Sequence, residues 1–251
     1  MSGTLYLIPT NLSDSFTPSR ILPTDVIATA IRLNYYVAEN AKSARAFLKS
    51  IGIDRPLQTI SIRELDSQTS ETALSEMISP LMAGNDVGLV SEAGAPGVAD
   101  PGAQLVALAH TQCIPVVPLV GPSSILLGLM ASGLNGQMFA FHGYLPTEKS
   151  ARIAAIAALE RESQQRAMTQ LFIETPYRNQ AMYENLLATL APSTMLCIAR
   201  DLTGRDECVQ TKSVSAWQQQ TADIEKLPTL FLLLARPAMR LPRKTERRRS
   251  A

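Results

Sequence analysis

The stretch Val87–Gly102, VGLVSEAGAPGVADPG, joins a short apolar run to a loop rich in glycine and proline. The run VGLV is typical of a buried strand in a parallel sheet. In the loop, Gly94 and Gly97 allow backbone angles that other residues avoid, whereas Pro96 and Pro101 fix φ and withhold a donor. A constrained loop directly after a buried strand is typical of the ligand-binding edge of an open α/β sheet.

The rest of the chain alternates apolar runs with segments of helical period, which predicts βα units around largely parallel sheets. Strands are expected at Leu5–Ile8, Tyr35–Ala38, Val87–Val90, Ile114–Leu119, Phe139–His142, Leu171–Glu174, Met195–Ala199 and Leu230–Leu234. Helices are expected at Lys42–Ser50, Glu71–Ala83, Ser150–Arg166 and Gln180–Leu190. Because the pattern restarts after Gly133, the fold class is two α/β domains, predicted at residues 1–122 and 123–238, with a basic tail at 239–251.

Composition limits the class of protein. The 251 residues contain no apolar run near the roughly 20 residues of a membrane helix, and the first residues lack the pattern of a signal peptide. We therefore expect a cytoplasmic protein with no membrane partner. The three cysteines are widely spaced and form no ligand pair, so neither a disulfide framework nor a metal site is expected.

The C-terminal segment from Arg236 to Ala251 holds seven Lys or Arg residues and one Glu, so the rest of the chain is net acidic. A run of like charges with little apolar content is expected to be disordered. It is either a solvated end or an arm that attracts nucleic acid, and the sequence leaves both open.

Two predicted strands end in loops that could bind a ligand. Glu92 could accept hydrogen bonds from ribose hydroxyls or an amino group, or it could be a solvated turn residue. Asp100 before Pro101 predicts a helix cap, which favours a structural role. In the loop GPSS, Ser123 and Ser124 could donate to a carboxylate or phosphate, although capping alone would explain one serine.

Several common sites are not indicated. The chain contains no G-x-x-x-x-G-K-[ST] motif, and AGAPG is not the dinucleotide fingerprint G-x-G-x-x-G. Its only histidines, His110 and His142, do not form a triad signature. Nucleoside triphosphates, dinucleotides and triad hydrolysis are therefore disfavoured.

The ordered set GTLYLIPT, VSEAGAPGVADPG, VPLVGPSSILLGLMASGL, FHGYLP, FIETPYR and ARDLT resembles the tetrapyrrole methylase superfamily. Within it, the chain is most similar to the branch that methylates a cytidine ribose 2′-hydroxyl in small-subunit ribosomal RNA. The resemblance covers nearly all of the chain except the basic tail. It implies two α/β domains, S-adenosyl-L-methionine in the cleft between them, a homodimer and a possible RNA acceptor.

The resemblance also implies which residues contact the cofactor. In the first part of the chain these are Pro9, Thr10, Glu92, Ala93, Gly94, Pro96, Ser123, Ser124 and Ile125. In the second part they are Ile173, Thr175, Leu202, Pro228 and Thr229.

Three motifs depart from the family pattern. The chain has PTNLSDSF in place of a P-I-G-N loop, ENAKSA in place of E-D-T-R, and SEAGAP in place of SDAGTP. By motif position Glu39 is the candidate base for a hydroxyl acceptor, with Lys42 orienting it or a phosphate. The alternative is that Glu39 and Asn40 cap a helix while Lys42 faces solvent. His142 and Tyr144 either line the acceptor side or pack at the domain junction.

Three functions therefore compete. The first is an S-adenosylmethionine-dependent methyltransferase that acts on RNA. The second is the same chemistry on a small molecule such as a tetrapyrrole, or on another macromolecule. The third is a regulatory protein that binds the cofactor without turnover.

Overall fold

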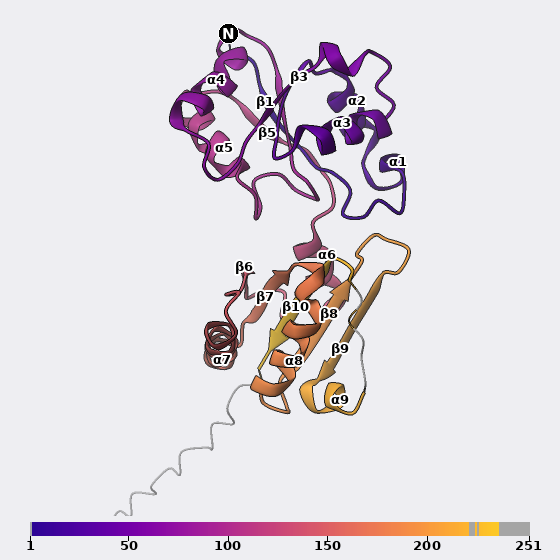
Figure 1. Cartoon of the computed structure of the whole chain (residues 1–251), viewed down its shortest axis with the longest axis vertical. Coiled ribbons are helices and arrows are strands. Elements are labelled where there is room, and N and C mark those ends of the chain that lie inside the picture. The colour runs from indigo at the N-terminus through magenta and orange to yellow at the C-terminus, as the bar shows by residue number, and fades with distance from the viewer. Residues whose placement is uncertain (1, 221–223, 225, 236–251) are drawn as a thin grey trace, which may run out of the picture. The chain divides into compact units, whose positions relative to one another are not determined.

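A computed structural model describes residues 2–220, 224 and 226–235, and its described part divides into two compact units (Figure 1). The first unit comprises Met1–Gly128 and Ala199–Cys208, and the second comprises Leu129–Ile198 and Val209–Ala251. The predicted basic tail, 239–251, lies outside the described residues. The domain limits expected from the sequence, 1–122 and 123–238, stay a prediction.

The first unit is built on a five-stranded sheet in the order β3-β2-β4-β1-β5, and its paired strands are parallel. The strands are β1 (Leu5–Ile8), β2 (Tyr35–Ala38), β3 (Ser61–Glu64), β4 (Val87–Val90) and β5 (Val116–Pro118). All four residues of the central strand β4 are buried, as its apolar run predicts. The parallel sheet predicted for this part of the chain is confirmed.

Helices cover both faces of this sheet. They are α1 (Pro18–Ile21), α2 (Thr24–Arg32), α3 (Ala41–Ser50), the 3-10 turn η1 (Leu57–Thr59), α4 (Glu71–Met82) and α5 (Gly102–Thr111). Since strand side chains alternate, Ile8, Tyr36 and Val90 pack against α2 and α3, while Leu5 and Leu89 pack against α4 and α5. The two helix pairs therefore lie on opposite faces (Figure 1).

The second unit has a five-stranded sheet in the order β6-β7-β10-β8-β9. Its strands are β6 (Phe139–Tyr144), β7 (Thr169–Glu174), β8 (Met195–Arg200), β9 (Cys208–Ser213) and β10 (Thr229–Leu234). Strand β6 runs parallel to β7, but β10 runs antiparallel to it. This sheet therefore contains an antiparallel pair and is mixed, which the expectation of largely parallel sheets did not include.

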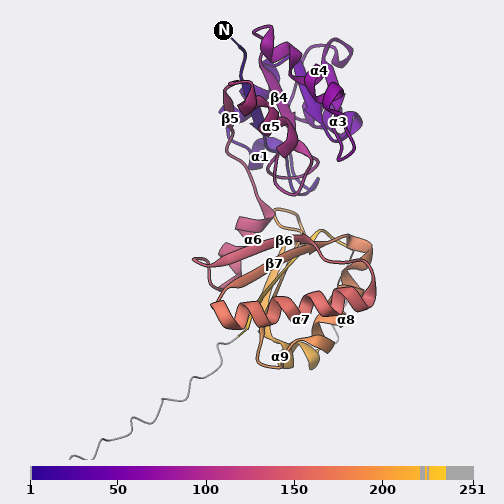
Figure 2. The same cartoon turned by 90° about the vertical axis from the view of Figure 1, so that its left-hand side faces the viewer.

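The helices of this part are α6 (Ser124–Ser132), α7 (Lys149–Arg166), the 3-10 turn η2 (Pro176–Arg178), α8 (Asn179–Thr189) and α9 (Val214–Gln218). Figure 2 shows the long helix α7 running along the sheet. Residues of α7 and α8, among them Ile156 and Met182, form one core with Phe172 and Phe231, whose rings stack at 5.7 Å. In the described part of the chain, no helix has both the length and the apolar character needed to cross a bilayer.

Candidate functional site

Strands β1 and β4 are neighbours, and their following segments lead to helices on opposite faces of the sheet. In open α/β sheets, ligands bind in the crevice that forms beside such a reversal, at the carboxyl ends of the strands. The backbone N–H of Thr10 donates to the carbonyl of Gly94 at 2.9 Å, and its hydroxyl donates to the carbonyl of Ser91 at 3.3 Å. The structure thus brings together Thr10 and Gly94, two residues predicted to contact the cofactor.

Gly94 lies where three loops meet. Its φ of +76° is left-handed, and a Cβ there would lie 2.9 Å from Leu12 Cδ2 and 3.3 Å from the carbonyl oxygen of Pro122. The loop GPSS approaches as closely, because a Cβ on Gly121 would lie 2.2 Å from Pro9 Cγ. The loops after β1, β4 and β5 therefore lie against one another, and a Cβ at Gly94 or Gly121 would require the side chains of Leu12 and Pro9 and the carbonyl of Pro122 to shift.

Asp100 shapes the far side of the loop after β4. Its Oδ1 accepts the N–H groups of Gly97 and Gly102, both at 2.8 Å, and partial burial raises the pKa of its carboxyl. The preceding Ala99 has a φ of +61°, which is costly for a residue with a Cβ. Asp100 is structural in this geometry, although α5 begins at Gly102, so the capping position is Pro101 and not the predicted Asp100.

Glu39 follows β2, the strand beside β4. Glu39 is exposed, but the protein around its carboxylate removes part of its water and raises its pKa, and the neighbouring carboxylates of Asp100 and Glu92 raise it further. The backbone N–H of Glu92 lies near enough to this carboxylate to lower its pKa in part. The structure therefore places the candidate base against the loop that carries Glu92, Ala93 and Gly94.

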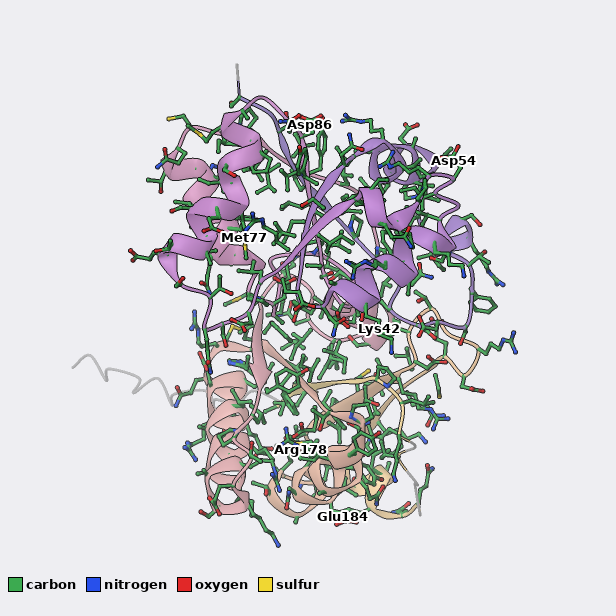
Figure 3. The ribbon with its side chains drawn as sticks, turned by 45° about the horizontal axis from the view of Figure 1, so that its top comes forward. Lys42, Asp54, Met77, Asp86, Arg178 and Glu184 are labelled. Carbon is green, nitrogen blue, oxygen red and sulfur yellow. The ribbon has the colours of Figure 1, made fainter. Side chains whose placement is uncertain are left out.

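The start of α3 is capped by Asn40 and not by Glu39. Asn40 Oδ1 accepts the N–H groups of Lys42 at 2.8 Å and Ser43 at 3.1 Å, and Glu64 accepts the N–H of Ala41. Lys42 lies on the first turn of this helix (Figure 3). Because the helix start is satisfied without it, Glu39 is left for another role.

The serines of GPSS begin α6. The carbonyl of Ser123 accepts the N–H of Leu127 at 2.9 Å, and the helix itself starts at Ser124. Ser123, Ser124 and Ile125 are all partly buried. The first-turn N–H groups of a helix are suited to an anionic group such as a carboxylate.

A second group of predicted residues meets in the second unit, where the end of β7 pairs with the start of β10. Ile173 lies opposite Leu230 in this register. Buried Thr229 accepts from Asn179 Nδ2 at 3.0 Å. Ile173, Thr175, Pro228 and Thr229 thus lie at one edge of the second sheet. Leu202 is buried in the segment Ala199–Cys208, which is grouped with the first unit.

Glu174 lies between the predicted contacts Ile173 and Thr175, but the sequence did not single it out. Its side chain has no exposed area, and its Oε1 accepts from the N–H of Thr175 at 2.7 Å and from Arg178 Nη2 at 2.6 Å. Among the described residues, its Oε2 and Asn179 Oδ1 are buried acceptors with no partner, and in the first unit so is Asn11 Oδ1. The available signal for Glu174 was an acidic residue closing the apolar strand LFIE.

No family model matches the chain. The chain is 34% identical over 210 residues to the ribosomal RNA small subunit methyltransferase I of Micromonospora olivasterospora. This alignment covers 82% of the chain and 61% of the relative. The chain is 31% identical over 227 residues to the protein of the same name from Xylella fastidiosa, over 89% of this chain and 77% of the relative. The protein of that name from Escherichia coli O157:H7 is 30% identical over 230 residues, with 89% and 75% covered.

The chain belongs to this methyltransferase family. The resemblance to the tetrapyrrole methylase superfamily, and to its ribosomal RNA branch, is confirmed. The chain spans less than two thirds of the length of the Micromonospora relative and about three quarters of the other two. Across the described residues, no group of three or more His, Cys, Asp or Glu side chains is arranged to hold a metal ion.

Proposed function

We propose that the chain is an S-adenosyl-L-methionine-dependent methyltransferase that acts on RNA, with a ribose 2′-hydroxyl as acceptor and the cytoplasm as its site of action. The observation that carries the proposal is the meeting of the loops of three family motifs around Gly94, at the ends of β1 and β4. The names of the similar proteins support the chemistry and the class of acceptor.

The residues of the crevice fit this cofactor chemically. S-adenosylmethionine carries a carboxylate, an amino group, ribose hydroxyls and a cationic sulfonium. The start of α6 suits the carboxylate, while Glu92 and the buried acceptor of Asn11 suit donors or positive charge. At Gly97 a Cβ would meet nothing within 4 Å, so the main chain there is open to a ligand.

The proposed cofactor contacts are those expected from the family motifs. In the first unit they are Pro9, Thr10, Glu92, Ala93, Gly94, Pro96, Ser123, Ser124, Ile125 and Leu202. In the second unit they are Ile173, Thr175, Pro228 and Thr229.

Proton transfer is the step that needs a side chain. The cofactor, when bound, supplies a methyl group already activated on sulfur, so alignment and exclusion of water provide most of the rate. A hydroxyl acceptor must still lose its proton, and we assign that proton to the carboxylate of Glu39. Its raised pKa brings the base closer to the working pH, which strengthens general base catalysis. Lys42, on the adjacent helical turn, would neutralise a phosphate of the acceptor.

A second copy of the chain is the proposed protein partner. Large apolar side chains are exposed on the edge strand β6 or directly before it, namely Met138, Phe139 and Tyr144 at 43%, 40% and 56%, and Met130 on α6 is 79% exposed. Exposed strand edges with apolar side chains are normally covered. Analytical ultracentrifugation should give a dimer that Phe139→Asp converts to a monomer, and a wild-type monomer at micromolar concentration contradicts the proposal.

The acceptor is tested by methyl transfer. Purified protein is given cofactor with a labelled methyl group and separate RNA, protein and small-molecule fractions from cells that lack the gene. We expect label in RNA, within alkali-resistant dinucleotides, because a methylated 2′-hydroxyl cannot assist cleavage of the next phosphodiester. Label confined to small molecules or protein would replace RNA as acceptor, and no label in any fraction would favour the regulatory alternative.

A further inference from the structure

Tyr177 is a large aromatic side chain that the second unit leaves in solvent. It lies on η2, between β7 and α8, and 83% of it is exposed. An exposed aromatic ring offers both a flat apolar face and a hydroxyl to a ligand, so Tyr177 is available for stacking.

The turn that carries Tyr177 is held firmly. Arg178 donates through Nε and Nη2 to buried Glu174 and through Nη1 to Thr147 Oγ1 at 3.2 Å. Its backbone N–H donates to the carbonyl of Thr175 at 2.9 Å. Figure 3 shows Arg178 at this turn. A ring mounted on such a turn loses little conformational entropy when a ligand stacks on it.

A cation accompanies the ring. Lys226 Nζ lies 5.6 Å from the centroid of the Tyr177 ring, and both side chains are exposed. The segment that carries Lys226 is tied to the same turn, because Asn179 Nδ2 donates to the carbonyl of Leu227 at 2.8 Å. An aromatic face beside a positive charge matches a nucleotide, whose base stacks on the ring while its phosphate meets the charge.

The position of this pair fits an acceptor site. Tyr177 follows Thr175 by two residues, and Lys226 precedes Pro228 by two, so the pair lies at the edge of the second sheet where cofactor contacts are proposed. The exposed side chain of Gln180, one turn from Tyr177, is polar, whereas a protein-docking surface usually presents a contiguous apolar patch.

We propose that Tyr177 and Lys226 form a stacking platform that holds one single-stranded nucleotide of the RNA acceptor. This inference rests on the proposed function, because it takes RNA as the acceptor.

The platform is tested with the full-length protein and a single-stranded RNA decamer that contains 2-aminopurine, whose fluorescence is quenched on stacking. Tyr177→Phe should keep both the affinity and the quench. Tyr177→Leu, which is apolar but not aromatic, should lose the quench and bind about 10-fold more weakly. Lys226→Ala should lower the slope of log affinity against log salt by about 0.7. Arg161→Ala, which removes an exposed charge on α7, serves as the control and should change neither.

The outcomes separate this proposal from the proposed function. Calorimetry with S-adenosylhomocysteine first shows that every variant keeps the fold and the cofactor site. If the wild type methylates RNA and Tyr177→Leu has an unchanged KM and quench, the platform is wrong and the function stands. If the wild type methylates no RNA, the proposed acceptor is wrong. If the quench is then also unchanged in Tyr177→Leu, the stacking platform is wrong as well. If Tyr177→Leu binds RNA as the wild type does but no longer binds a protein that the wild type binds, the surface is a protein interface and the platform is wrong.

Discussion

The two units fix their candidate binding residues by different means. In the first unit the crevice is made of main chain: Gly94 has a left-handed φ, and its carbonyl accepts from Thr10. In the second unit the corresponding edge is braced by buried polar side chains, with Glu174 paired to Arg178 and Asn179 bonded to Thr229. The first arrangement should fail when atoms are added, and the second when atoms are removed.

The largest effect is expected at Glu39, which is an exception to this contrast: it belongs to the first unit, but its side chain is proposed to act in the chemistry. If Glu39 takes the acceptor proton, Glu39→Gln should lower methyl transfer by about 10²- to 10⁴-fold while cofactor affinity stays unchanged. Glu39 is exposed and glutamine has nearly the same shape, so the fold should hold. Single-turnover assays and calorimetry on one variant measure both quantities, and wild-type turnover would remove the catalytic assignment.

The same residue sets a pH dependence. Partial loss of water around its carboxylate and the neighbouring carboxylates raise the pKa of Glu39, so its carboxyl becomes protonated at a higher pH than an ordinary glutamate. A protonated carboxyl cannot accept the acceptor proton, and methyl transfer should therefore fall as pH falls through this raised value. Because the folded state binds this proton more tightly than the unfolded state, the charged form costs stability at neutral pH, and Glu39→Gln should not destabilise the protein. An acid limb that persists in the variant would assign it to another group.

The next effect adds atoms to the main-chain crevice. Gly94→Val should weaken binding of S-adenosylhomocysteine by about 100-fold or more, because the branched side chain meets Leu12 and the carbonyl of Pro122 and forces the loops apart. Gly52→Val is the matched control, since Gly52 has a φ of +86° but nothing within 4 Å of its added Cβ. Both variants carry similar backbone strain. Equal cofactor affinity in the two variants, measured by calorimetry, would contradict the idea of a cradle around Gly94.

The third effect removes atoms from the brace of the second unit. Glu174→Ala should cost about 2–3 kcal/mol of unfolding free energy, less than a fully buried pair would lose because 34% of Arg178 is exposed. Glu162→Ala breaks another i, i+4 pair, with Arg166, whose side chains are 39% and 57% exposed, and should cost about 0.5 kcal/mol or less. Urea unfolding compares the two. If both variants lose the same small amount, Glu174 is not a structural brace.

The sequence predicted strands whose side chains are buried and missed strands whose side chains are exposed or polar. The bounds of β1, β2 and β4 were predicted residue for residue, because each is an apolar run in the core. Strand β3 was missed, since its side chains are mostly exposed at a sheet edge and give no apolar run. Strand β9 was missed for a similar reason, as its sequence CVQTKS is largely polar.

One part of the candidate site could also be predicted from the sequence, and another part could not. The meeting of Thr10 with Gly94 follows from two parallel strands ending at one edge, which the order of the motifs indicates. The burial of Glu174 could not be predicted, because it depends on the antiparallel return of β10 and on the approach of Arg178. The cofactor residues themselves stay predictions in both units.

The smallest effect separates two adjacent residues that the sequence could not tell apart. Both Glu39 and Asn40 are able to cap a helix, but in the structure only Asn40 accepts the N–H groups of Lys42 and Ser43. Asn40→Ala should therefore cost about 1 kcal/mol of unfolding free energy and leave turnover near that of the wild type. Asn40→Asp keeps an acceptor oxygen and should recover most of that loss. If Asn40→Ala instead lowers turnover as far as Glu39→Gln does at unchanged stability, the start of α3 acts in the chemistry, and the assignment of the proton to Glu39 alone is lost.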